Sequence, residues 1–145
     1  MPIEVVHAVT DELLEAMQRL MPQLNPGHPV PDRQALERIV HSEASTLLVS
    51  RDDSGRITGM LTLVVFHTPS GTHAWIEDVV VDAGSRGQGF GEALTRTAID
   101  MAHELGADSV NLTSRPAREA ANRLYQRVGF QLRQTNVYRY YLPPK

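Results

Sequence analysis

The segment between residues 75 and 113 changes its hydrophobic pattern twice, from strand-like to helix-like and back to strand-like. An apolar run ends at Val81, and a short loop leads into a long apolar stripe at helical spacing that stops at Gly106. A second strand-like run covers residues 109–113. Two strands joined through a helix form a right-handed crossover, which makes the two strands parallel. This unit therefore requires a sheet that contains a parallel pair and has a helix packed on its face.

The part of the chain before this unit predicts two helices and most of the sheet. A strand covers residues 3–9, an amphipathic helix follows, and Asp32 caps a second, short helix after a loop rich in proline. Alternating apolar residues then predict three strands over 46–51, 57–67 and 73–81, separated by short turns. Short turns join neighbouring strands as antiparallel pairs, so these three strands form a meander.

The part after the unit predicts one more helix and two more strands. Pro116 opens an amphipathic helix that Gly129 ends, and strands cover residues 130–135 and 137–142. The fold expected from the whole chain is mixed α/β (α+β), with a largely antiparallel sheet, one parallel pair and helices on both faces.

Length and composition limit the domain organisation and the class of protein. With 145 residues, 41% of them apolar, the chain is expected to form a single domain over residues 1–145. It has no cysteine, which excludes disulfides, thiol catalysis and cysteine-based metal sites, and the spacing of its six histidines predicts no metal site either. The start of the chain lacks a signal-peptide pattern, and no apolar run approaches the roughly 18 residues of a membrane span. We therefore expect a cytoplasmic protein with no membrane attachment.

The charge of the chain is unevenly distributed. The formal net charge is −3, but the segment from Arg115 to Lys145 holds seven basic residues and a single acid, Glu119. A local arginine cluster on an otherwise acidic protein suits a compact polyanionic ligand better than a nucleic acid, which normally binds a basic domain. The alternative is a solvated helix face. No nucleic-acid partner is expected, and the acidic remainder favours a cationic small molecule by electrostatic steering.

The strongest chemical signal is a glycine-rich turn, Arg86-Gly87-Gln88-Gly89-Phe90-Gly91, at the junction of strand and long helix. Glycine lets a ligand approach the backbone closely, and the first turn of a helix offers unpaired N–H groups that bind phosphate. A Walker A loop is excluded because Glu92 follows the last glycine where a lysine is required. A dinucleotide fingerprint is weakly supported, since the next strand ends without an acidic residue.

Three motifs together resemble the GNAT superfamily of N-acetyltransferases. The turn has the Arg-x-x-Gly-x-Gly pattern of that family's acetyl-CoA pyrophosphate loop. The run Ile76-Glu77-Asp78-Val79-Val80-Val81 resembles its central strand, and residues 121–130 contain its Asn-x-x-Tyr-x-x-x-Gly-Phe pattern. The motifs stand in the family's order and spacing across residues 75–130. The resemblance implies a single GNAT-like domain in which the parallel strands splay apart at the cofactor cleft.

The resemblance also implies how acetyl-CoA is bound as cosubstrate. Backbone groups of strand 79–81 would pair with the pantetheine arm like an added strand, while the glycine-rich turn would hold the pyrophosphate. Strand 79–81 would be buried in any fold, however, and Asn122 would also suit a plain helix surface. The residues that the resemblance assigns to the cofactor are Val79, Val80, Val81, Arg86, Gly87, Gln88, Gly89, Phe90, Gly91, Glu92 and Asn122.

Glu77 is the candidate general base. Strand alternation places Glu77, Val79 and Val81 on one face and Asp78 on the other. Asp78 is the second candidate, because a bulge in this strand would reverse the alternation. The alternative role of Glu77 is to orient the substrate or to form a salt bridge. The family's most common base position corresponds to Trp75 here, so this chain departs from the family at that point.

Tyr125 resembles the family's general acid, which protonates the departing sulfur. Its alternative role is packing, because it adjoins the apolar stripe of its helix. The N–H of Val79 is a candidate oxyanion donor. No covalent acyl-enzyme is expected, because the chain has no cysteine and direct attack by a bound amine suffices.

The predicted activity is transfer of an acetyl group from acetyl-CoA directly to a primary amine in a ternary complex. The acceptor is expected to be a small molecule such as an amino sugar, a polyamine or an amino-acid-like compound. Two alternatives remain: acetylation of a peptide or protein amine, and a non-catalytic acyl-CoA-binding sensor. A homodimer is compatible with the sequence.

Overall fold

One mixed sheet forms the centre of the computed structural model, which describes residues 2–145. Its strands lie in the order β1-β2-β3-β4-β5, and the first four are antiparallel neighbours. β5 runs parallel to β4 and pairs with it only at Ala74 and Trp75. The predicted meander and parallel pair are confirmed. The strands are β1 (Ile3–Val5), β2 (Ser45–Arg51), β3 (Ile57–Thr68), β4 (Gly71–Val81) and β5 (Val110–Asn111).

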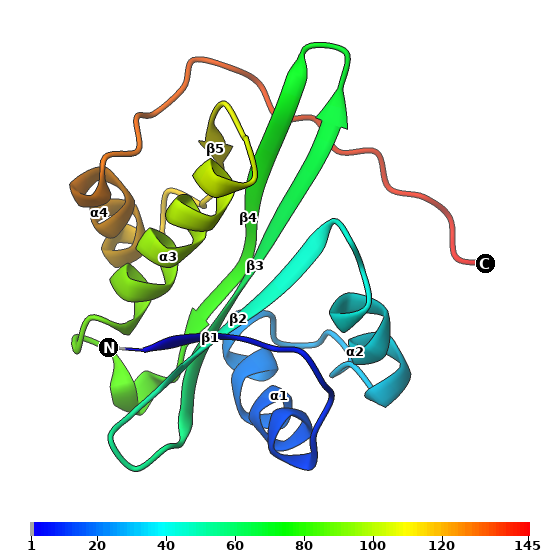
Figure 1. The fold of residues 1–145 in the computed structure, drawn as a ribbon, viewed down its shortest axis with the longest axis vertical. Helices are drawn as coiled ribbons and strands as arrows, with labels where there is room; N and C mark the ends of the chain where they lie inside the picture. The colour runs from blue at the N-terminus through cyan, green and yellow to red at the C-terminus, as the bar shows by residue number, and fades with distance from the viewer. Residues whose placement is uncertain (1) are drawn as a thin grey trace.

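Helices cover both faces of the sheet, as predicted (Figure 1). Two helices from the first part of the chain lie on one face, and two from the second part lie on the other. Asp32 caps its short helix as expected, accepting the N–H of Ala35 at 2.8 Å. The helices are α1 (Asp11–Leu24), α2 (Arg33–Val40), α3 (Phe90–Glu104) and α4 (Glu119–Val128), with a 3-10 turn, η1 (Ala83–Ser85), before α3. No helix of the described residues is long and apolar enough to cross a membrane.

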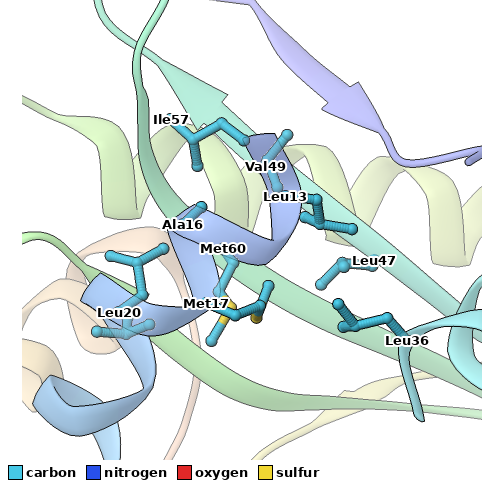
Figure 2. Close-up of a cluster of buried hydrophobic side chains, with 10 residues drawn as sticks. Leu13, Ala16, Met17, Leu20, Leu36, Leu47, Val49, Ile57 and Met60 are labelled. Atoms are coloured by element: carbon cyan, nitrogen blue, oxygen red, sulfur yellow. The ribbon is translucent and has the colours of Figure 1, made fainter. Parts of the chain in front are cut away.

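Each face of the sheet has its own hydrophobic core. On the α3 face, buried residues from β2 to β4 pack against a stripe of α3 that includes Leu94, Ala98 and Ala102. On the other face, α1 and α2 bury their apolar stripes against β2, β3 and β4 (Figure 2). Fully burying a large apolar side chain stabilises a fold by roughly 1.5–3 kcal/mol. The second core consists of Leu13, Ala16, Met17, Leu20, Leu36, Leu47, Val49, Ile57, Met60 and Val80.

A β-bulge divides β4. Thr62 of β3 pairs with Glu77, but Met60 pairs with Val80, so two residues of β4 stand opposite one residue of β3. Asp78, at the bulge, has φ of +53°. An extra residue reverses which face the following side chains meet. Val80 accordingly packs in the α1 core and Val79 against the α3 core. The predicted alternation, with Glu77, Val79 and Val81 on one face, is therefore wrong.

The chain after α4 differs from the prediction. Residues 130–135 and 137–142 form no regular secondary structure and pair with no strand of the described residues, so the two predicted strands are wrong. Figure 1 shows this segment leaving α4 and ending away from the helices. Leu132 is 95% exposed and Tyr138 is 87% exposed. An alternating pattern provides a strand's side chains but not the neighbouring backbone with which a strand must pair. The last helix also begins at Glu119, three residues after Pro116.

Candidate active site at the separation of β4 and β5

A cleft of about 570 Å³ lies where β4 and β5 separate. The two strands pair only as far as Trp75 and Asn111, and the chain beyond each of them forms a wall of the cleft. The end of α1, the helix α4 and the C-terminal segment complete it. The lining residues are Leu24, Asn25, Ile76, Glu77, Asp78, Val79, Leu112, Thr113, Ser114, Arg115, Arg118, Tyr125, Val137 and Arg139.

Glu77 lies on the β4 wall of this cleft, next to the bulge. Its side chain is exposed to the cleft, but the surrounding walls remove part of its water, and this desolvation raises the pKa of the Glu77 carboxyl. The negative charge of Asp78 raises the pKa further, and the positive charge of Arg139 lowers it. A carboxylate with a raised pKa is a stronger base, and a stronger base takes a proton from an amine more readily. The position suits a general base.

Tyr125 faces the same cleft from α4 and is only 6% exposed. Burial raises the pKa of its phenol, partly offset by the charge of Arg118, so the group is held in the protonated form that can donate. The Gly129-Phe130 part of the motif fixes its position. The N–H of Phe130 donates to the Tyr125 carbonyl at 2.9 Å, and the Phe130 ring meets the Tyr125 ring edge-on at 5.8 Å.

The glycine-rich turn forms the N-terminal end of α3. Gly87 and Gly89 adopt φ of +79° and +89°, a region that favours glycine, and Gly89 caps the helix. The helix's first bond is from the N–H of Ala93 to the carbonyl of Gly89, at 3.0 Å. The N–H groups before Ala93 therefore point out of the helix end. A Cβ at Gly87 would meet no atom within 4 Å, so the space beside the backbone is open. These features fit a phosphate group.

Two of the predicted cofactor side chains are engaged elsewhere in the fold. The Glu92 carboxylate lies 3.2 Å from Arg96 and 3.1 Å from Arg127, whose hydrogen bonds lower its pKa. Asn122 donates its amide to the carbonyls of Arg115 and Arg118, both at 2.9 Å, and thereby holds the loop before α4. The Glu92 side chain is therefore ion-paired and the Asn122 side chain holds the loop, while the contacts expected of both residues with acetyl-CoA stay predictions.

The remaining predicted residues divide between the cleft and the turn. Glu77, Val79 and Tyr125 come together in the cleft, whereas no residue of 83–92 lines it. Val80 is buried in the α1 core, and the first residue of α3, Phe90, is buried as well. Arg86 donates to the carbonyl of Val81 at 3.3 Å, at the end of β4. The roles expected for these residues, for Gln88 and for Gly91 toward acetyl-CoA stay predictions.

Three arginines in the cleft were not among the predicted site residues. Arg115 and Arg118 lie just before the start of α4, and Arg139 comes from the C-terminal segment. Their signal in the sequence is the excess of basic residues after position 114. That excess indicates an anionic ligand but does not show which of its arginines meet.

Comparison with known proteins identifies the family. The sequence model of the Acetyltransferase (GNAT) family matches residues 10–130, which is most of the chain. The chain belongs to the GNAT family of acetyltransferases. The resemblance of its three motifs to that family is thereby confirmed.

Individual GNAT proteins resemble it in sequence and in fold. The uncharacterized N-acetyltransferase YhdJ of Bacillus subtilis is 33% identical over 102 residues, 68% of this chain and 70% of that protein. Glucosamine 6-phosphate N-acetyltransferase 1 of rice (Oryza sativa subsp. japonica) is 30% identical over 105 residues, 67% of this chain and 64% of that protein. The crystal structure of the aminoglycoside acetyltransferase meta-AAC0020, from an uncultured soil metagenomic sample, superposes with a TM-score of 0.83. It is 21% identical and covers 99% of this chain and 96% of its own. The GNAT fold is therefore shown.

Proposed function

We propose that this GNAT protein transfers an acetyl group from acetyl-CoA to a primary amine of a small molecule. The observation that carries the proposal is that Glu77 and Tyr125, from different elements, line one cleft at the point where β4 and β5 separate. The pKa of the Glu77 carboxyl is raised, which makes its carboxylate a stronger base. The pKa of the Tyr125 phenol is also raised, which keeps that group protonated. Two of the similar proteins are named for amine-bearing small molecules, glucosamine 6-phosphate and aminoglycosides. They support a small-molecule acceptor here.

The cosubstrate would lie between the turn and the cleft. Acetyl-CoA supplies an acetyl group on a thioester, whose carbonyl carbon accepts the attacking amine. The N–H groups at the start of α3 bind its pyrophosphate, and Arg86 adds a positive charge beside them. β5 does not pair with β4 beyond Trp75, so that edge of β4 is free for the pantetheine amides. The N–H of Val79 is the donor for the carbonyl oxygen.

The reaction needs two kinds of proton transfer, and Glu77 and Tyr125 each carry out one kind. An alkylamine with a pKa of about 10.4 is mostly protonated at pH 7, and freeing its lone pair costs about 4.6 kcal/mol. Glu77 takes that proton, directly or through water, and releases it to solvent. It takes the second proton from the nitrogen as the C–N bond forms, and this proton later restores the Tyr125 phenol through water. The C–S bond then breaks, and Tyr125 gives its proton to the sulfur. A thiol has a pKa near 8.5, so this transfer to the sulfur needs less help. The products are the N-acetylated amine and free CoA.

A binding measurement followed by an activity measurement tests the proposal. Acetyl-CoA at about 100 times its dissociation constant should stabilise the protein by roughly 2.7 kcal/mol, which corresponds to about 5–10 °C in Tm. CoA should act similarly, and NADH and ATP should not. Thiol release with a panel of amines then measures turnover. The Tyr125→Phe variant should lose about 10–100-fold in kcat, least above pH 8.5, where the thiolate leaves unaided.

The matched control is Tyr138→Phe, because Tyr138 is exposed and outside the cleft. It should keep wild-type turnover. Absence of any shift with acetyl-CoA, or an equal shift with NADH, would contradict the proposal. A shift without turnover on any amine would favour the sensor function instead.

A further inference from the structure

The cleft contains arginines that have no carboxylate partner. Five arginines elsewhere form ion pairs with Asp or Glu: Arg19, Arg33, Arg51, Arg96 and Arg127. Arg115, Arg118 and Arg139 form none with any of the described residues, although two acids, Glu77 and Asp78, line the same cleft. The three guanidinium groups therefore exceed the carboxylates of the cleft by one positive charge, and they have unused donors.

These arginines stand beside the reacting groups and away from the cofactor turn. The charge of Arg139 acts on Glu77, and the charge of Arg118 acts on Tyr125. No residue of the turn 83–92 shares the cleft with them. A phosphate bound at the start of α3 would thus be served by that helix end and Arg86, while the cleft arginines would remain free.

The loop that carries two of the arginines is held in place. The N–H of Arg118 donates to the carbonyl of Arg115 at 3.0 Å, and the Asn122 amide bonds both carbonyls. Ser114, the residue before them, lines the cleft with a buried hydroxyl that has no hydrogen-bond partner among the described residues. Buried polar groups are normally paired, so this hydroxyl is an additional donor for an oxygen-rich ligand.

We propose that the amine acceptor also carries an oxyanion, a phosphate or a carboxylate, which Arg115, Arg118 and Arg139 bind while the amine faces Glu77. The planar guanidinium fork matches either oxyanion in bidentate geometry. The inference rests on the proposed function and defines its substrate class. It replaces the cationic acceptor expected from the overall acidic charge, because local charge in the cleft outweighs distant charge that salt screens.

Matched amines that differ only in an anionic group test the inference. The pairs are glucosamine 6-phosphate with glucosamine, O-phosphoethanolamine with ethanolamine, and lysine with cadaverine, each assayed by thiol release at saturating acetyl-CoA. The anionic member of at least one pair should have a kcat/KM roughly 10–100-fold higher. Arg139→Gln should remove most of that preference by raising the KM for the anionic amine much more than the KM for the partner without the anionic group. Arg115→Gln and Arg118→Gln should act in the same direction.

The control is Arg133→Gln, in the same C-terminal segment but outside the cleft, and it should keep the preference. Calorimetry of the CoA complex provides a measurement without turnover: O-phosphoethanolamine should bind the wild type more tightly than Arg139→Gln. Equal or faster acetylation of the members without the anionic group would overturn the inference and leave the proposed function standing. A rise in the KM for acetyl-CoA instead of that for the amine, in the arginine variants, would also overturn it. Absence of both acetyl-CoA binding and turnover would refute both proposals.

Discussion

The two halves of β4 follow each other without a break in the sequence, yet they have different surroundings. In the first half, up to Ile76, every residue pairs with β3, and Ala74 and Ile76 are buried in the α3 core. In the second half, β5 no longer pairs with β4, the bulge at Asp78 interrupts the register, and Glu77 and Asp78 are exposed to the cleft. The first half stabilises the sheet, and the second exposes acidic side chains and backbone to the cleft. A single strand can do both because a bulge ends the regular pairing locally.

Removing the Glu77 carboxylate, in the second half of β4, should have the largest effect on activity. Glu77→Gln should lower kcat by about 10²–10⁴-fold, since a general base contributes that much. Asp78→Asn is the matched control and should cost much less; a larger loss in Asp78→Asn would make Asp78 the base. Because desolvation raises the pKa of Glu77, wild-type kcat should rise with pH over a range above that of an ordinary Glu. A kcat–pH profile should show this limb in the wild type and lose it in Glu77→Gln.

Truncating the first half should affect stability and spare chemistry. Ile76→Ala creates a cavity in the α3 core and should lower the free energy of unfolding by about 2–5 kcal/mol. The same truncation after the bulge, Val79→Ala, should cost less because Val79 is only partly buried. Chemical denaturation measures both. Similar losses for the two variants would remove the distinction between the halves.

Changing the backbone preference at the bulge should have the smallest effect. A β-branched residue strongly disfavours φ of +53°, so Asp78→Val should destabilise the protein by roughly 1–3 kcal/mol. Asp78→Gly, which removes the same carboxylate but accepts that φ, is the control and should unfold at a denaturant concentration close to that of the wild type. If the two variants are equally stable, the backbone conformation at position 78 is not what holds the bulge.

The elements predicted correctly are those with a local cause. Helical spacing of apolar residues, the Asp32 cap and the glycines at helix ends act within a few residues, and the corresponding helices are present. The meander has the same origin, because short turns leave neighbouring strands no other arrangement. The strands expected over 130–135 and 137–142 failed for the opposite reason, since pairing depends on a partner that their own pattern cannot specify.

By itself, the sequence determined the glycine turn at the start of α3, the motif that places Tyr125, and hence the family. These depend on residue type and short spacing, which the chain order preserves. Only the tertiary structure decided that a bulge follows Glu77, so that Ile76 and Val79, three positions apart, both pack at the α3 core. It also decided which arginines line the same cleft as Glu77, because Arg115 and Arg139 come from different segments of the chain and only the tertiary fold places both at this cleft.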